Sequence, residues 1–245
     1  MIIYLKSKEE IEGFKIAGRI TGEILNIVLS KVEPGISTEQ LNQIALSECK
    51  KRNVKPAFLG QYDFPAAICA SVNKCLVHGL PNLRPLQEGD FVSIDLGINY
   101  NGFIGDSAET VVVGKEPSDI IINCRESLNN AIKKALPTNT LNDISKEIFS
   151  SAKYSIPFGY GGHGVGVNEL HSDPYVSNVE EENDVSLYPG MVFAIEPMLI
   201  DGSEITTVSK DGFSVMANGQ TAHCEHTIAI TEEEPIILTE RSLNE

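Results

Sequence analysis

The chain of 245 residues is long enough for one large domain or two small ones, and its composition, 42% hydrophobic and 22% charged, is typical of a globular protein. Lysine and arginine number 19 against 34 aspartates and glutamates, which gives a formal net charge of −15. A chain this acidic, with no cluster of basic residues, binds phosphate backbones poorly, so nucleic-acid binding is not expected.

The sequence shows no pattern of an exported or membrane-anchored protein. Its start is too short for a signal peptide, and no apolar run approaches about 18 residues. The 5 cysteines are odd in number and include no Cys-x-x-Cys pair. In a chain of this length, that usage favours free thiols in a reducing cytoplasm over a disulfide framework or a zinc knuckle. We therefore expect a cytoplasmic protein without membrane contact.

Two helices are predicted at the beginning of the chain. Ser7 and Glu10 form a capping-box pattern, and apolar residues at helical spacing then predict a helix over about 8–31. Pro34 ends this helix, and a second, shorter helix is expected over 37–51.

A β-hairpin is predicted in the middle of the first half. Two β-rich runs flank Asn99-Tyr100-Asn101-Gly102, and each run carries one aspartate among apolar residues, Asp95 before the turn and Asp106 after it. Because side chains alternate faces along a strand, the hairpin can bring both carboxylates over one face, where they need a cation or a proton. The pattern fits a metal-binding hairpin. It equally fits one aspartate that caps a turn and another that meets solvent.

The order of predicted elements then repeats. A long helix is expected after Ser118 and a shorter one after Thr140, followed again by strands. We interpret this as an internal duplication, roughly 7–115 and 117–232, within a single domain of residues 1–245. Two unrelated helical hairpins would give the same order of elements.

The second half of the chain holds a histidine among glycines and two glutamates within apolar segments. His163 lies in a run rich in glycine, 159–166, which lacks the Gly-Lys-Ser/Thr of a phosphate loop and the glycine spacing of a Rossmann fold. Strands are expected over 191–198 and 221–230, and these apolar segments hold Glu196 and Glu225. An acid in such a strand is costly to bury without a partner.

Four acids in apolar strands and one histidine among glycines suggest a common site: Asp95, Asp106, His163, Glu196 and Glu225. This set is too rich in oxygen for a structural zinc site, and it suits two divalent ions of the Co, Mn, Fe or Zn kind. Two such ions about 3.5–4 Å apart can stabilise a tetrahedral intermediate, which is hydrolase chemistry. The sequence does not select the native metal, because sites of this kind accept several.

Over nearly its whole length the chain resembles the methionine aminopeptidases, and among them the bacterial-type, type I group. Several separate motifs carry the resemblance in the family's order: His78-Gly-Leu-Pro, Asp95-Leu-Gly, Asp106-Ser-Ala, Gly-His163-Gly-Val-Gly, Glu196-Pro-Met and Cys-Glu225-His-Thr. The resemblance implies a pita-bread fold of the α+β class, with two pseudo-symmetric halves whose helices pack on one side of a curved antiparallel sheet. It implies removal of the initiator methionine from nascent polypeptides whose second residue is small.

The resemblance also implies a role for each site residue. The five residues of the common site would ligate two metal ions, with Asp106 and Glu225 bridging them, and Glu196 would accept and relay a proton. His78 would lie near the scissile amide, and His171 would hydrogen-bond the carbonyl oxygen. Taken singly, His78 and His171 would be ordinary loop or surface histidines.

Two further histidines match no ligand position of the family. His226 is the immediate neighbour of Glu225 and, on a strand, points to the opposite face. His223 shares the face of Glu225 but has no counterpart among the family's ligands. We interpret both as structural.

The chain departs from the family pattern near the expected substrate pocket. One residue more than usual separates His163 from His171, which leaves the position of His171 open, and Gln61 stands where an aromatic residue is frequent. Phe213 replaces a common tryptophan. The wall that receives the methionine side chain is expected to contain Phe58, Phe64, Cys69, Leu170 and Phe213. Ordinary core packing would explain each of these residues equally well.

Two alternative functions use the same residues. An aminopeptidase P or prolidase-like relative shares the fold, but such enzymes typically carry an extra N-terminal domain, whereas this chain starts directly at its first predicted helix. A non-catalytic binding relative would have lost metal ligands, and here all of them are retained. We expect a monomer that acts on the N-termini of nascent chains. Work near the ribosome is compatible with this role, although the acidic surface makes direct contact with ribosomal RNA unpromising.

Overall fold

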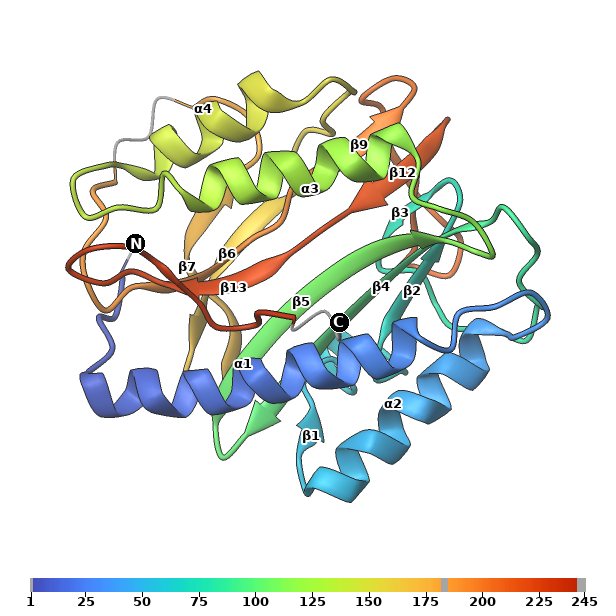
Figure 1. Cartoon of the computed structure of the whole chain (residues 1–245), viewed down its shortest axis with the longest axis horizontal. Helices are drawn as coiled ribbons and strands as arrows, with labels where there is room; N and C mark the ends of the chain where they lie inside the picture. Colours follow the sequence, from blue (N-terminus) through green and yellow to red (C-terminus); the bar gives the residue numbers. More distant parts are fainter. Residues whose placement is uncertain (1, 182–184, 242–245) are drawn as a thin grey trace.

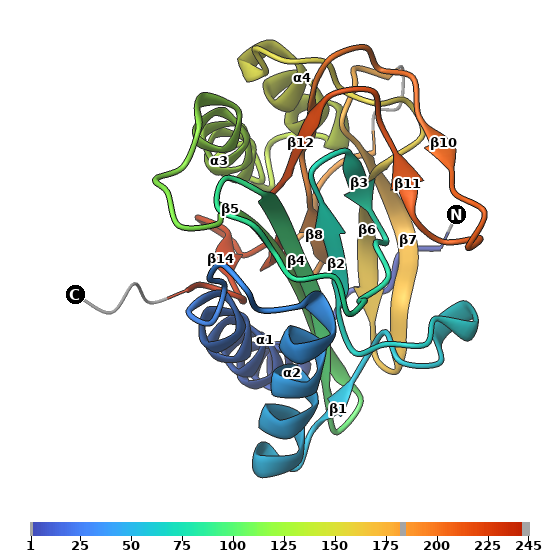
Figure 2. The ribbon, with the colours of Figure 1, turned by 90° about the vertical axis from the view of Figure 1, so that its right-hand side faces the viewer.

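The computed structural model describes residues 2–181 and 185–241, in which two pairs of helices pack against antiparallel strands (Figure 1). The helices are α1 (Lys8–Leu29), α2 (Thr38–Arg52), α3 (Asp119–Ile132) and α4 (Leu141–Ser151). Figure 2 shows both helix pairs on the same side of the long strands. The mixed α and β architecture and the four predicted helices are confirmed.

Side-chain caps explain where three of these helices begin. Ser7, Ser37 and Thr140 each accept a hydrogen bond from the backbone N–H three residues later, and the acidic or amide side chain at that position bonds back. Each of these capping boxes satisfies two backbone donors that a helix start leaves free, and loss of such a cap typically costs about 1 kcal/mol. The caps are local features, which is why the sequence predicts them well.

The first sheet contains the predicted hairpin. It consists of β1 (Lys55–Pro56), β4 (Phe91–Tyr100) and β2 (Cys69–Val72) in the order β1-β4-β2, with β5 (Phe103–Val112) also paired to β4. Apolar residues of α1, α2 and β4 form a buried cluster beneath the helices.

The second sheet supplies the other part of the fold. Its five strands follow the order β14-β13-β8-β6-β7, and their bounds are Ile236–Ile237, His226–Ala229, Val192–Ile195, Gly161–Gly166 and Glu169–Ser177. A second apolar cluster lies between this sheet and the helices α3 and α4. Two smaller groups complete the strands: β10 (Thr207–Val208) with β11 (Val215–Met216) and β3 (Cys75–Val77), and β12 (Gln220–His223) with β9 (Met198–Asp201).

Glycines in α1 let this helix approach its neighbours closely. A Cβ atom on Gly105 of β5 would lie 2.7 Å from the Cα of Gly18, and a Cβ atom on Gly18 would collide with the carbonyl of Leu238. Glycine costs helix propensity, but here it allows backbone to pack directly on backbone. The N-terminal helix, the hairpin and the C-terminal segment are thereby packed together.

Two of the predicted strands are interrupted, which corrects the sequence prediction. The segment 191–198 divides into β8 and β9 at Glu196, and the segment 221–230 divides into β12 and β13 at Glu225. The backbone N–H of Glu225 bonds instead to the carbonyl of Ala108 on β5, at 2.9 Å. At Glu225 a bonding partner far away in the sequence thus replaces the regular pairing. At Glu196 the next residue is Pro197, which has no N–H to donate to a strand ladder.

The two halves of the chain have matching element orders, since each runs through two helices and then strands. We propose that residues 7–115 and 117–232 are pseudo-repeats of one domain, as their sequence patterns predict. The strands β5 and β13 lie in contact where the two halves meet.

Candidate active site

The hairpin β4–β5 brings its two aspartates to one face. Asn101 and Gly102 take positive φ angles of 52° and 95°, the backbone that a tight two-residue turn requires. Asp95 pairs with Ala108 and Asp106 pairs with Gly97, so the two aspartates sit at diagonal positions of the same face. The hairpin and its arrangement of acids are confirmed.

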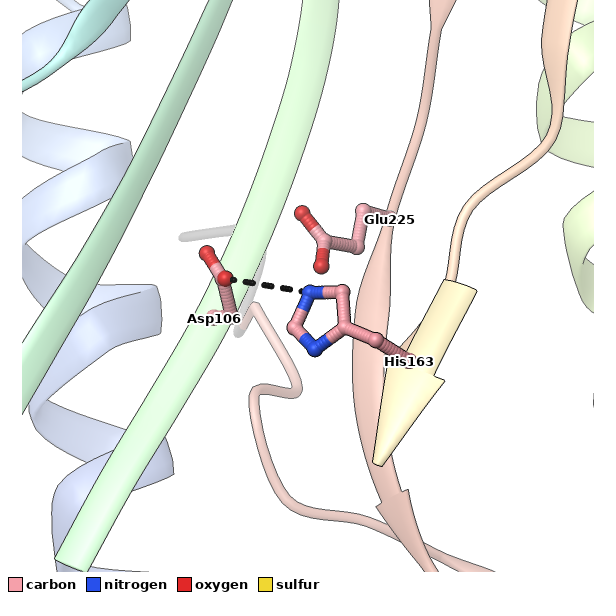
Figure 3. Close-up of side chains that lie close together, drawn as sticks. All are labelled: Asp106, His163 and Glu225. Atoms are coloured by element: carbon pink, nitrogen blue, oxygen red, sulfur yellow. Dashed lines mark ion pairs between the residues drawn. The ribbon is translucent and has the colours of Figure 1, made fainter. Parts of the chain in front are cut away.

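Three side chains from the second half of the chain, His163, Glu196 and Glu225, lie close to the aspartates of the hairpin. The Nε2 atom of His163, on β6, lies 3.7 Å from Oδ2 of Asp106 and 3.7 Å from Oε1 of Glu196. Atoms of Asp106, His163 and Glu225 that could ligate a metal all lie within 4.8 Å of one another (Figure 3). Figure 3 shows these three side chains, which come from different segments, directed toward one common point.

The acids of this cluster are buried with few partners. Asp106, Glu196 and Glu225 are each less than a tenth exposed. In the part of the chain that the structure describes, one carboxylate oxygen on each of Asp95, Asp106 and Glu225 is buried without a hydrogen bond. Unsatisfied buried oxygens of this kind cost free energy unless a cation or a proton occupies the space between them.

Burial and mutual repulsion set the protonation of these acids. Burial, followed by the charge of Glu196, raises the pKa of Asp106 to about 8, and burial raises the pKa of Glu196 to about 8. The same causes raise the pKa of Asp95 and Glu225 well above their usual range. Burial lowers the pKa of His163 to about 3, so its imidazole is neutral and able to act as a ligand. This donor set of carboxylates and one neutral imidazole fits divalent metal ions.

A cavity of about 630 Å³ opens beside the cluster. All five residues predicted for the methionine pocket contribute to its wall: Phe58, Phe64, Cys69, Leu170 and Phe213. The rings of Phe64 and Phe213 meet edge to face with centroids 5.4 Å apart. Apolar walls therefore lead directly to the carboxylates, as in a pocket that holds a side chain next to a reacting bond.

His78 and His171 both line this cavity. Burial lowers the pKa of His78 to about 4 and also lowers that of His171, so both rings are neutral at pH 7. The ring of His171 meets that of His163 edge to face, with centroids 4.3 Å apart. The ring of Tyr62 also stacks on that of His171, with centroids 6.0 Å apart, a contact that the sequence did not indicate.

The pairing of β6 with β7 is irregular in the segment that separates His163 from His171. The register shifts between His163 and Gly164 and again between Gly164 and Gly166. Such shifts allow one strand to hold more residues than its partner without moving the flanking side chains. His171 therefore lies beside His163 despite the altered spacing, which settles the position that the sequence left open.

Two residues near the cluster were not predicted as parts of the site. The Nε2 atom of His223 lies 3.3 Å from Oε2 of Glu196. Arg241 donates hydrogen bonds to Oγ of Ser107 at 2.8 Å and to Oε2 of Glu109 at 2.8 Å. The sequence could have indicated His223, because strand alternation puts it on the same face as Glu225. No local sequence pattern connects Arg241 with the hairpin.

Comparison with known proteins places the chain among metallopeptidases and their relatives. The model of metallopeptidase family M24 matches residues 12–232. A methionine aminopeptidase of Aquifex aeolicus is 45% identical, over 98% of this chain and 100% of that protein. The crystal structure of a methionine aminopeptidase from Thermotoga maritima has a TM-score of 0.94 at 38% identity and covers 98% of this chain and 100% of that chain.

A prolidase from Pyrococcus furiosus also resembles the chain, with a TM-score of 0.76 at 25% identity. The match covers 96% of this chain and 65% of that chain. The likeness to the methionine aminopeptidases is higher in identity and extends over their full length.

Proposed function

The chain belongs to metallopeptidase family M24, and from that membership we propose that its site removes the N-terminal methionine of polypeptides by hydrolysing their first peptide bond. It is a metallo-aminopeptidase with the pita-bread fold. The observation that carries the substrate assignment is the cavity, because its apolar and aromatic wall ends at the cluster of carboxylates and imidazole.

Enzymes of this kind use divalent metal ions, and the buried acids with unsatisfied oxygens fit such ions. We propose that the ions are held by the residues that the sequence predicts: Asp95, Asp106, His163, Glu196 and Glu225. Bound divalent ions supply Lewis acidity toward a water molecule and toward the substrate carbonyl. Two ions of the Co, Mn, Fe or Zn kind suit this donor set, and the proposal leaves the native metal open.

Glu196 is proposed to move the proton during hydrolysis. Its carboxylate lies at the strand break between β8 and β9, beside both His163 and the cavity. A carboxylate beside the attacking water can accept a proton from it as a general base and pass that proton to the leaving amine as a general acid. The proton moves from water to a Glu196 oxygen and then to the nitrogen of the cleaved bond.

His78 and His171 are proposed to orient the substrate. Both rings are neutral, so each offers one N–H donor and one acceptor nitrogen to a bound peptide. We assign His78 to the scissile amide and His171 to the carbonyl oxygen, where a donor stabilises the charge that develops during attack.

The wall of the cavity is proposed to select methionine. An unbranched thioether side chain fills a pocket of aromatic and aliphatic groups well, and sulfur makes favourable contacts with ring edges. Phe58, Phe64 and Phe213 supply the rings, and Cys69 and Leu170 supply smaller apolar surface. The preference for a small second residue rests on the family resemblance alone.

The cellular location and the oligomeric state of the enzyme are also part of the proposal. In residues 2–181 and 185–241 no helix is both long enough and apolar enough to span a membrane. The five cysteines are free thiols, which is usual in a reducing compartment. We propose that the protein is a cytoplasmic monomer that acts on the N-termini of newly made chains. Action near the ribosome is compatible with this proposal.

A peptide assay on the purified protein tests this function. The protein is loaded in turn with Mn²⁺, Co²⁺ or Fe²⁺ and offered Met-Gly-Met-Met, Ala-Pro and Leu-Gly-Gly, with D106N as the matched inactive control. We expect release of methionine alone. Cleavage before proline without methionine release would favour the prolidase alternative, and no turnover with any metal would favour a non-catalytic relative.

A further inference from the structure

His223 is a buried imidazole that the proposed mechanism does not use. It is 2% exposed, and burial is costly for a polar ring atom that lacks a partner. Its Nε2 atom makes no aligned hydrogen bond with any residue in 2–181 or 185–241. A carboxylate oxygen lies within reach, since Oε2 of Glu196 is 3.3 Å from this atom.

The backbone around His223 is held firmly in place. The hydroxyl of Thr110 on β5 accepts a hydrogen bond from the His223 N–H at 2.9 Å and donates one to the His223 carbonyl at 2.8 Å. The strand β12 also pairs His223 with Met198, two residues after Glu196. The ring therefore stands at a fixed position beside the strand break that carries Glu196.

The backbone of Glu196 is fixed as well, because Asn178 donates a hydrogen bond to its carbonyl at 2.9 Å. What remains free is the rotation of the carboxylate. Its two oxygens face two imidazoles: Oε1 lies 3.7 Å from His163 and Oε2 lies 3.3 Å from His223. A carboxylate can only accept, so a favourable contact requires the hydrogen of His223 to be on Nε2.

We propose that His223 is a positioning residue that donates from Nε2–H to Oε2 of Glu196 and thereby directs Oε1 toward His163 and the metal cluster. This deepens the proposed function, on which its catalytic consequence rests. Outer hydrogen bonds of this kind orient metal ligands, and their loss typically lowers metal affinity or activity about 10- to 100-fold.

A pair of variants of equal length separates donation from packing. His223→Gln keeps an N–H donor at similar reach, whereas His223→Met fills similar space without a donor. Mn²⁺ binding to the metal-free protein is measured by calorimetry, and kcat and KM are measured with Met-Gly-Met-Met. His226→Met is the matched control, because His226 is also buried but its Nδ1 atom lies 2.9 Å from Oγ1 of Thr239.

We expect His223→Gln to bind Mn²⁺ within about 3-fold of the unaltered protein, and His223→Met to bind it about 10- to 100-fold more weakly. In His223→Met the kcat should fall by a similar factor with little change in KM, since the apolar wall is untouched. Equal losses in the Gln and Met variants would overturn the proposal, as would an equal loss in His226→Met or unchanged Mn²⁺ affinity in His223→Met.

If His223→Met does not fold, as judged by circular dichroism, His223→Leu takes its place as the variant without a donor. Near-normal Mn²⁺ affinity in His223→Gln together with a loss of about 10-fold or more in the folded donor-free variant supports donation, and equal affinities in the two overturn it. Failure of the proposed function looks different, because unaltered protein would then bind Mn²⁺ without releasing methionine, and the calorimetric comparison would remain valid.

Discussion

Thr227 and Asp106, which are 121 positions apart in the sequence, form two hydrogen bonds with each other. The hydroxyl of Thr227 accepts from the backbone N–H of Asp106 at 2.8 Å and donates to the carbonyl of Asp106 at 2.8 Å. Thr227 is fully buried and follows Glu225 by two residues. The side chain of Thr227, in the second half of the chain, therefore holds the backbone of Asp106, in the first half. Asp106 is a proposed metal ligand, and Thr227 lies on the strand that follows another, Glu225.

Replacement of Thr227 by valine tests this connection. Valine has the same shape but leaves the N–H and the carbonyl of Asp106 buried without partners. We expect the free energy of unfolding to fall by about 2–4 kcal/mol, since each unsatisfied buried group costs about 1–3 kcal/mol. Urea denaturation measures the change. Thr207→Val at an exposed position of β10 is the control and should change stability by less than about 0.5 kcal/mol, and an equal effect in both variants would contradict the assigned role.

Replacement of Asp106 by asparagine should have opposite effects on metal binding and on the stability of the metal-free protein. The amide keeps the size of the side chain but removes one of several repelling acids, so the metal-free protein should become more stable. Mn²⁺ affinity should fall by more than about 100-fold, beyond the effect of losing a supporting hydrogen bond. Calorimetry and thermal denaturation measure both quantities. Asp201→Asn, at an exposed position, should change neither, and retained Mn²⁺ affinity in D106N would refute the metal-site assignment.

The metal-free protein should lose stability as the pH rises from about 7.5 to 8.5, through the raised pKa values of two buried acids. The acids Asp106 and Glu196 have folded-state pKa values near 8, above their ordinary values of 3.8 and 4.5, so the folded state holds protons that the unfolded state releases. Their contribution to stability is complete below the unfolded pKa and is lost as the pH rises through the folded pKa. Below about pH 7.5 the histidines oppose this loss, because their rings are neutral in the folded state, whereas the unfolded chain, with histidine pKa values of 6.5, still binds protons. Above about pH 7.5 they are neutral in both states and add little slope.

Thermal denaturation with and without Mn²⁺ measures this pH dependence. Saturating Mn²⁺ should remove the fall in stability, because a cation between the carboxylates favours their charged forms. A metal-free protein whose stability is flat or rises between about pH 7.5 and 8.5 would contradict the predicted repulsion.

Replacement of Phe213 by alanine should widen the cavity and relax its selectivity. The variant removes the ring that packs edge to face on Phe64. We expect kcat/KM for Met-Gly-Met-Met to fall roughly 10-fold, and the rate for Phe-Gly-Met-Met relative to it to rise, because pocket discrimination of this kind is worth about 1–3 kcal/mol. Phe149→Ala on α4, where the ring is 54% exposed, is the control. An unchanged ratio in Phe213→Ala would place the methionine side chain elsewhere.

The sequence alone determined what depends on neighbouring residues. The capping boxes at Ser7 and Thr140, the turn at Asn101 and the alternation that puts Asp95 and Asp106 on one face all act within a few positions. The identity of the candidate ligands was also predicted from residue type and from family motifs. Whether these residues bind the metals stays a prediction, although the structure brings them together.

Only the tertiary structure decided how distant segments meet. Glu196 and Glu225 lie at strand breaks, where backbone groups bond to distant partners such as Ala108. The contact of His223 with Glu196, and the bonds of Arg241 to Glu109 and Ser107, join segments that share no local pattern. The physical reason is that apolar periodicity encodes which face of a segment is buried, whereas burial against a particular partner depends on the packing of the whole chain.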